Sequence, residues 1–204
     1  MGAFEAISVF DLKVFEWFER VLWNPVLDFI MALISFLGED GILFIALIIV
    51  LLCFKKTRKI GLTMGAALLL MQILNNMVLK EIIARPRPFQ YEGYIDFHYP
   101  DIAFFGKIPT SFSFPSGHTS SAFTCATAMF ANNKKGGIVM FVFAALMGIS
   151  RIYLHDHYFS DVLCGMILGV LYGIAGYVLG KWVYEKGKQL WEKKKAKKAA
   201  EPSA

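Results

Sequence analysis

The sequence predicts an all-α, polytopic membrane protein: a bundle of six transmembrane helices preceded by an N-terminal amphipathic helix. Apolar residues make up 56% of its 204 residues, and the mean hydropathy is +0.52, above the range of ordinary soluble domains. Apolar stretches of membrane-spanning character recur along the chain. Cations cluster in short runs that flank those stretches. The length predicts one domain.

Residues 1–22 are expected to form an amphipathic helix that lies in the membrane interface. Across residues 7–21, large apolar side chains recur at helical spacing and charged side chains lie between them. We expect no secretory signal peptide, because the first twelve residues contain Glu5 and Asp11 but no Lys or Arg. Insertion into the membrane should therefore depend on the first internal apolar segments.

Residues 23–183 are expected to contain the six spans. A glycine-rich turn at 38–41 separates the first span, which is short and carries Asp28, from the second. Residues 85–88 should end the third span, because each proline biases the preceding residue away from helical angles. The expected spans are 23–37, 42–54, 60–83, 115–131, 138–153 and 159–183.

The basic residues predict the orientation in the membrane. Eight of the 21 Lys and Arg lie in residues 181–198, four in 55–59 and two at 134–135. Six spans would place these segments and both termini on one side, which the positive-inside rule assigns to the cytoplasm. Residues 184–204 then form a basic cytoplasmic tail, and the loop 89–114 faces outward. Since the cations flank apolar runs, we expect membrane lipids and no nucleic acid as partners.

Glycines in the sixth expected span predict close helix packing. Gly165, Gly169 and Gly173 recur at four-residue steps, and small residues at this spacing let helices approach each other. The pattern favours packing within the bundle and leaves a homodimer face as the alternative.

Three short polar blocks lie at the edges of apolar segments, and all reach the predicted outer side. Together they hold cations, two histidines, a carboxylate and a Ser-Gly turn, which suits a phosphorus oxyanion that is attacked and protonated in turn. In chain order they contain Lys80 and Arg87, then Ser116, Gly117 and His118, then Ser150, Arg151, His157 and Asp161.

The cations of these blocks are candidate phosphate ligands. Lys80 lies inside an apolar span, where a charge is costly and usually functional, although a lysine can also extend to the interface. Arg87 follows about two helical turns later and would share its face if the helix continued. Arg151 offers forked donors that match phosphate oxygens. For Arg85 the sequence leaves two roles open, a second contact with the anion or an anchor to a lipid headgroup.

The second block opens an apolar helix. Free N–H groups of a first helical turn, with a glycine that allows close approach, favour anion binding at Ser116 and Gly117. His118 would reach the same place from that turn. An ordinary helix start with an incidental histidine is the alternative.

His157 and Asp161 are four residues apart, which places carboxylate and imidazole side by side on a helix. Such a pair fixes one tautomer and supports a cationic ring. His155 and Asp156 are expected at the surface or in supporting positions, because they would face elsewhere on a regular helix.

A metal site built from His118, His157 and Asp161 is the main rival interpretation, since two imidazoles and a carboxylate are adequate ligands for zinc or iron. The cations of the same blocks would repel a divalent ion and favour an anion instead. We therefore expect no metal and no cofactor.

The three blocks resemble the tripartite signature of the type 2 phosphatidic acid phosphatases, which vanadium haloperoxidases and bacterial acid phosphatases share. The resemblance spans residues 80–161. It implies that His157 is the nucleophile and forms a phosphohistidine, that Asp161 orients it, and that His118 protonates the leaving oxygen and later activates water. It also implies that the phosphate oxygens are held by Lys80, Arg87, Ser116, Gly117, Ser150 and Arg151.

We therefore expect metal-independent hydrolysis of a lipid phosphate or diphosphate at the outer face of the cytoplasmic membrane. Family analogy favours undecaprenyl diphosphate as substrate, with phosphatidylglycerol phosphate or phosphatidate as the alternative. A non-catalytic lipid-phosphate binder or transporter would not need the two histidines, and a vanadate-holding haloperoxidase would not need long apolar spans.

Overall fold

The computed structural model describes residues 3–90 and 109–200, and within these ranges the chain forms helices and no strands. The expected all-α class is confirmed. Most of the expected outer loop 89–114 lies outside the described residues. The elements are α1 (Ala3–Leu22), α2 (Pro25–Leu37), η1 (Glu39–Gly41), α3 (Ile42–Cys53), α4 (Arg58–Met71), η2 (Gln72–Leu79), α5 (Lys80–Ile83), η3 (Pro88–Gln90), α6 (Gly117–Asn132), α7 (Lys134–Tyr153) and α8 (Phe159–Ala200).

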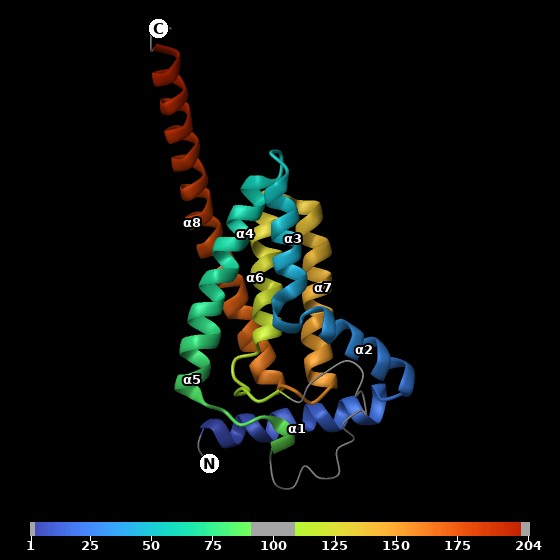
Figure 1. Cartoon of the computed structure of the whole chain (residues 1–204). Helices are drawn as coiled ribbons and strands as arrows, with labels where there is room; N and C mark the ends of the chain where they lie inside the picture. The colour runs from blue at the N-terminus through green and yellow to red at the C-terminus, as the bar shows by residue number, and fades with distance from the viewer. Residues whose placement is uncertain (1–2, 91–108, 201–204) are drawn as a thin grey trace.

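Helix α6 forms the centre of the bundle. It packs against α7 and α8 most extensively, and also against α4 and α3 (Figure 1). Its side chains are mainly Ala, Ser and Thr, and most of those between Thr119 and Met129 are buried. Small side chains allow the neighbouring helices to approach, so a helix with modest hydropathy occupies the core.

The glycines of α8 face neighbouring helices, as their spacing predicts. A Cβ atom on Gly169 would lie 2.7 Å from the carbonyl oxygen of Ser120 in α6, and one on Gly176 would lie 2.1 Å from the Cα of Ala67 in α4. Thr124 of α6 also donates a hydrogen bond of 3.1 Å to the Gly169 carbonyl. The glycine stripe is therefore used for packing within the bundle.

The expected first two spans do not form a hairpin. Helices α2 and α3 meet at η1 with a bend of 41°, so the chain keeps its general direction. Asp40 and Gly41 adopt positive φ values of 50° and 69° at this bend. Among the described residues, three helices are long and apolar enough to cross a membrane, or four if this bent pair is one span. The count of six spans is not confirmed.

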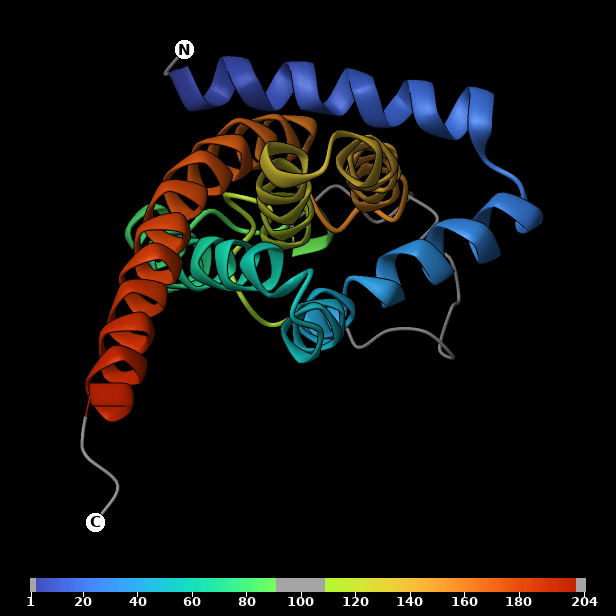
Figure 2. The same ribbon diagram turned by 90° about the horizontal axis from the view of Figure 1, so that it is seen from above.

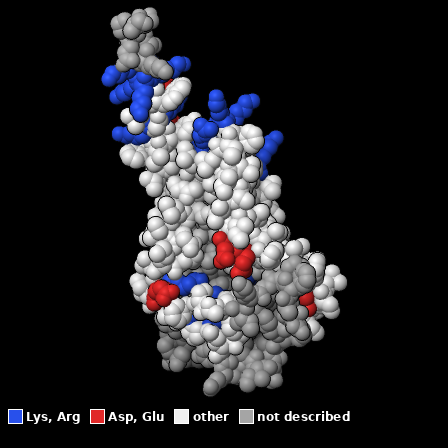
Figure 3. All heavy atoms as spheres, in the orientation of Figure 1, with Lys and Arg blue, Asp and Glu red and all other residues white. Residues whose placement is uncertain are grey.

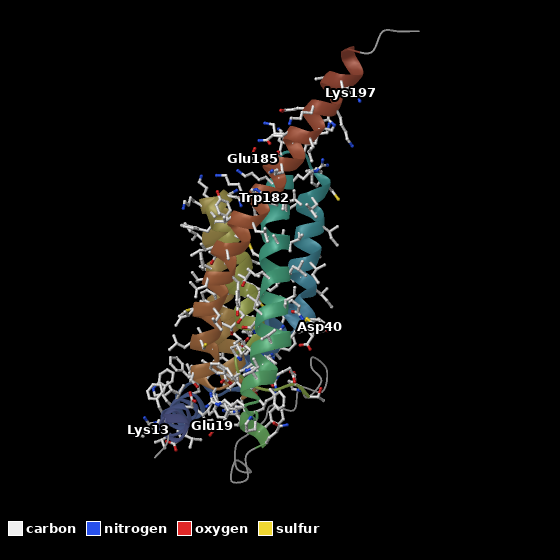
Figure 4. The ribbon with its side chains drawn as sticks, turned by 90° about the vertical axis from the view of Figure 1, so that its left-hand side faces the viewer. Lys13, Glu19, Asp40, Trp182, Glu185 and Lys197 are labelled. Carbon is white, nitrogen blue, oxygen red and sulfur yellow. The ribbon has the colours of Figure 1, made fainter. Side chains whose placement is uncertain are left out.

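Consequently the two termini lie at opposite ends of the bundle, and the expectation of both on one side is wrong (Figure 1). The glycine-rich segment at 38–41 bends the chain instead of reversing it. Figure 3 shows Lys and Arg gathered at the end where α8 leaves the bundle, with a broad belt of uncharged side chains below them. In Figure 4, Lys13 and Glu19 mark α1 at one end, and Glu185 and Lys197 mark α8 at the other.

Helix α1 runs across the end of the bundle beside α7 and α8 (Figures 1 and 2). Phe10 and Trp17 are exposed, whereas Asp11 and Phe15 are fully buried. Phe15 packs against Tyr158, with ring centroids 5.9 Å apart. One face of α1 thus contacts protein, and its placement in a membrane interface stays a prediction.

Candidate active site

The three polar blocks meet at the end of the bundle that α1 crosses. There α5, the start of α6, the end of α7 and the start of α8 come together (Figure 1). The structure brings together the charged residues that the sequence singled out and buries most of them. Lys80, Arg87, Arg151, His157 and Asp161 are each at most 7% exposed.

The two ring nitrogens of His157 face different surroundings. Nδ1 lies 3.5 Å from Oδ2 of Asp161 and 3.4 Å from Oγ of Ser113. Nε2 lies 3.5 Å from Nη1 of Arg87. The pairing with Asp161 is the one that the four-residue spacing predicts. A proton on Nδ1 would therefore point at the carboxylate and leave the Nε2 lone pair directed toward the cations.

The charge state of His157 follows from its burial. Desolvation lowers the pKa of His157 well below its ordinary value, and the positive charges of Arg87, Arg151 and Lys80 act in the same direction. The ring is therefore neutral at neutral pH. A neutral imidazole is the form that can attack phosphorus.

Asp161 is held by more partners than the sequence indicated. Its Oδ2 accepts a very short hydrogen bond from the Ser113 hydroxyl and one of 3.0 Å from the Tyr158 backbone N–H. Its Oδ1 lies 2.6 Å from Nη1 of Arg85. The sequence did not indicate the contacts that Arg85 makes: its guanidinium pairs with protein carboxylates and lies over the Tyr158 ring, 3.8 Å from the centroid.

Arg85 also forms an ion pair with Asp11 of α1, in which Nη2 of Arg85 lies 2.8 Å from Oδ2 of Asp11. Asp11 is fully buried and also accepts hydrogen bonds from the backbone N–H of Ser160, at 2.9 Å, and from its hydroxyl, at 2.7 Å. Sequence reasoning missed this role. The available signal was the position of Asp11 four residues before Phe15, which places it on the apolar face of α1.

Arg87 is fixed by oxygen atoms around its guanidinium. Its Nε donates to the Ser111 carbonyl at 2.6 Å, and Nη2 donates to the Ser111 hydroxyl at 3.0 Å. Nη1 donates to the Asp156 carbonyl at 2.9 Å and faces Nε2 of His157. These contacts aim a rigid cation at the candidate nucleophile, which suits binding of a phosphate oxygen between them.

Arg151 is similarly anchored. Nη2 lies 2.8 Å from Oδ2 of Asp156, and Nη1 donates a hydrogen bond to the hydroxyl of Ser35 in α2. His155 and Asp156 do not lie at the surface, since each is 4% exposed. Asp156 instead takes the supporting position that was the other expectation, because it pairs with Arg151 and its carbonyl accepts from Arg87. The chain leaves helical geometry between α7 and α8, and His155 has a positive φ of 54°, so periodicity along a regular helix does not apply.

The start of α6 reaches the same end of the bundle. The Ser116 backbone N–H donates to the Asp161 carbonyl at 3.2 Å, and the hydroxyl of Ser116 lies 3.0 Å from that of Thr119. A Cβ on Gly117 would lie 3.0 Å from the side-chain oxygen of Asn76, so this approach favours glycine. Contacts of Ser116 and Gly117 with a phosphate stay predictions.

Ser150 differs from the other candidates. It is fully buried, and its hydroxyl donates to the Met147 carbonyl of the same helix at 2.7 Å. The hydroxyl therefore stabilises its own helix in this structure. A role in holding phosphate would require it to rotate away from that carbonyl and stays a prediction.

The second histidine has an unexpected partner. Nε2 of His118 lies 3.4 Å from Oε2 of Glu39 in η1. The His118 side chain is 17% exposed and that of Glu39 is 44% exposed. Glu39 lies in the segment that the sequence indicated only as a turn. An acidic residue between two glycines did not predict that this segment would contact His118.

The described residues contain no group of three or more His, Cys, Asp and Glu side chains arranged to hold a metal ion. Metal independence of the reaction nevertheless stays a prediction.

A protein-family model matches the part of the chain that contains most of these site residues. The model described as PAP2 superfamily matches residues 56–185, which include all three polar blocks. This chain belongs to the PAP2 superfamily. The predicted family resemblance is thus confirmed. With its apolar helices, the chain is a multi-pass membrane protein of this superfamily.

Relatives of known sequence and structure agree with this membership. The chain is 32% identical over 157 residues to an undecaprenyl-diphosphatase of Sulfolobus acidocaldarius, covering 76% of this chain and 72% of the relative. It is 34% identical to phosphatidylglycerophosphatase B of Bacillus subtilis, covering 72% of each. The crystal structure of a transmembrane PAP2 type phosphatidylglycerolphosphate phosphatase from Bacillus subtilis superposes with a TM-score of 0.65 at 31% identity, covering 89% of this chain and 87% of that one. Aquifex aeolicus LpxE gives a TM-score of 0.64 at 29% identity, covering 81% and 93%.

Proposed function

We propose that this protein hydrolyses a lipid phosphate or diphosphate through a phosphohistidine formed on Nε2 of His157. The main support for this proposal is that the two ring nitrogens of the buried, neutral His157 imidazole have different neighbours. Asp161 lies beside Nδ1 and Arg87 lies beside Nε2. A nucleophile held in one tautomer next to a cation is suited to attack on a phosphorus centre.

In the first step, Nε2 of His157 forms a bond to phosphorus while the bond from phosphorus to the leaving oxygen breaks. The proton on Nδ1 stays directed at Asp161, which stabilises the ring as it becomes positive. Charge on the phosphoryl oxygens is stabilised by Lys80, Arg87 and Arg151. His118 donates a proton to the leaving oxygen.

In the second step, water attacks the phosphorus of the phosphohistidine and His118 accepts a proton from that water. The bond between phosphorus and Nε2 of His157 breaks, and inorganic phosphate is released. His118 is protonated again, as at the start of the cycle. No metal ion takes part, so a chelator should leave the rate nearly unchanged.

Undecaprenyl diphosphate is the substrate that we propose first, giving undecaprenyl phosphate and inorganic phosphate. This choice is supported by the relatives named undecaprenyl-diphosphatase from Sulfolobus acidocaldarius and Bacillus subtilis. Phosphatidylglycerol phosphate is the second candidate, because phosphatidylglycerophosphatase B of Bacillus subtilis is of comparable identity. A binder or transporter without catalysis would hold the lipid phosphate but would not release phosphate.

We further propose that the site faces the outer side of the cytoplasmic membrane. The basic residues gather at the opposite end of the bundle, which the positive-inside rule assigns to the cytoplasm (Figure 3). Since α2 and α3 keep one direction, α1 would then lie on the outer side. The chain would cross five times instead of six, because α6 would form a crossing in addition to the bent pair α2–α3 and the three longer helices. Outside labelling should modify a cysteine placed on α1 and spare one placed in the tail.

Phosphate release by detergent-purified protein tests the reaction. Undecaprenyl diphosphate, phosphatidylglycerol phosphate and phosphatidate should be compared, with and without chelator. His157→Ala should abolish release and trapping of a phosphoenzyme. Lys80→Ala should lower kcat/KM by about tenfold or more, a loss of at least roughly 1.4 kcal/mol in transition-state stabilisation. Lys135→Ala removes an exposed cation at the other end of the bundle and should leave kcat/KM unchanged. Phosphoenzyme formation by His157→Ala would place the nucleophile elsewhere.

A further inference from the structure

The segment of residues 38–41 lies against the second histidine. The Glu39 carboxylate reaches within 3.4 Å of Nε2 of His118. On the other side of the bend, a Cβ on Gly38 would lie 3.0 Å from Cδ2 of the same ring and 2.5 Å from the methyl carbon of Met147. The backbone therefore packs directly on the imidazole that the proposed mechanism uses as the acid. Glu39 lies outside the residues that the family model matches.

The bend that presents Glu39 has an unusual backbone. Asp40 and Gly41 follow it with φ values of 50° and 69°. A non-glycine residue in this region is uncommon and persists where its surroundings determine it. Asp40 lies on the flank of the bundle in Figure 4. The bend thus places the Glu39 side chain over His118 and keeps part of it in contact with solvent.

The charged groups that act on His118 favour opposite protonation states. Burial most strongly, and then Arg151 from α7, disfavour a positive imidazole, whereas Glu39 from η1 and Asp156 from the turn after α7 favour it. Asp156 is already paired with Arg151 at 2.8 Å. Nε2 of His118 is buried, and the Glu39 carboxylate is the anion that lies within ion-pair distance of it among the described residues. A buried imidazole needs such a counter-ion to be charged.

We propose that Glu39 is a positioning residue that acts through His118 as its counter-ion. This inference rests on the proposed function. An ionised Glu39 favours the protonated form of His118 against the effects of burial and Arg151, so that the ring can give its proton to the leaving oxygen. After water attack returns a proton to the ring, Glu39 stabilises the charged form again. Glu39 itself stays ionised throughout and exchanges no atoms with the substrate.

The proposal predicts a particular kinetic defect. Glu39→Gln removes the negative charge and keeps the shape. Turnover of a lipid phosphate, whose alkoxide must be protonated, should fall by roughly tenfold or more, within the usual contribution of a general acid. In the pH–rate profile of Glu39→Gln, the alkaline limb should move to lower pH by about one unit, because the imidazole has lost an opposite charge at this distance. An aryl phosphate with a good leaving group should lose much less. Glu39→Asp should restore the pH profile in part.

Asp40→Asn is the matched control, because it makes the same charge change at the neighbouring position of the same bend. It should leave the pH profile and the ratio of the two substrates unchanged. Equal losses on both substrates with an unmoved pH profile in Glu39→Gln would overturn the proposal in favour of a structural role. A wild-type protein inactive on every phosphate would refute the proposed function instead.

A measurement without turnover separates these cases. The His118 ring can be followed by NMR in labelled protein, with His118→Gln used to assign its signal. Glu39→Gln should lower the pH at which the ring loses its proton, and Asp40→Asn should not. An identical titration in Glu39→Gln and wild type would show that Glu39 is not the counter-ion, whatever the activity.

Discussion

The buried carboxylate of Asp11 should link α1 to catalysis, and Asp11→Ala tests this link. The change removes one ion pair to Arg85 and the two hydrogen bonds from Ser160, at distances of 2.7 to 2.9 Å. Removing one partner of a buried pair costs about 3–5 kcal/mol. Arg85 keeps its contact with Asp161 at 2.6 Å. We therefore expect the cost to lie near the lower limit, at about 3 kcal/mol.

This loss should appear locally before it appears globally. Among the described helices, α1 packs on the ends of α7 and α8, so weakened docking should release α1 first. Hydrogen exchange of residues 3–22 should accelerate by about 100-fold, which corresponds to roughly 3 kcal/mol. Turnover should also fall, because Arg85 would neutralise Asp161 alone and weaken its hold on His157.

Glu16→Ala is the control, since it removes an exposed carboxylate from the same helix. It should change neither exchange nor turnover. If Asp11→Ala matches Glu16→Ala in both measurements, Asp11 does not anchor α1. If α1 is released while turnover is unchanged, the ion pairs anchor the helix without tuning the catalytic carboxylate.

The remaining predictions concern packing and pH. Gly176→Val should separate α8 from α4 and lower the Tm by several degrees, because a Cβ would lie 2.1 Å from the Cα of Ala67, whereas Gly187→Val has open space and should change the Tm little. The lowered pKa of His157 predicts that stability falls as pH drops below its ordinary value of 6.5, because the unfolded imidazole then binds a proton that the folded one excludes. The unfolding midpoints of the wild type and of His157→Gln should converge as the pH falls from 7 to 5. If the two midpoints instead change in parallel with pH, His157 is not the group whose lowered pKa causes the loss of stability.

The sequence alone indicated most of the residues that meet at the candidate site, because they lie in three short blocks. The four-residue spacing of His157 and Asp161 predicted that these two side chains lie together, and the structure pairs them at 3.5 Å although His157 precedes the start of α8 at Phe159. The glycines of α8 predicted close helix packing, since a missing side chain has the same consequence in any bundle. The apolar stretches and the polar blocks at their edges likewise indicated a membrane family with a phosphate site, and the PAP2 superfamily match confirms that family.

Only the tertiary structure decided which distant groups complete the site. Asp11 reaches Arg85, and Glu39 reaches His118, across long stretches of chain that carry no spacing rule. The segment 38–41 shows the same limit, because glycines permit both a reversal and a bend, and sequence cannot choose between them. Packing of α2 and α3 on the bundle selects the bend. Long-range packing thus determined the direction of the chain, the position of α1 and the partners of both candidate catalytic histidines.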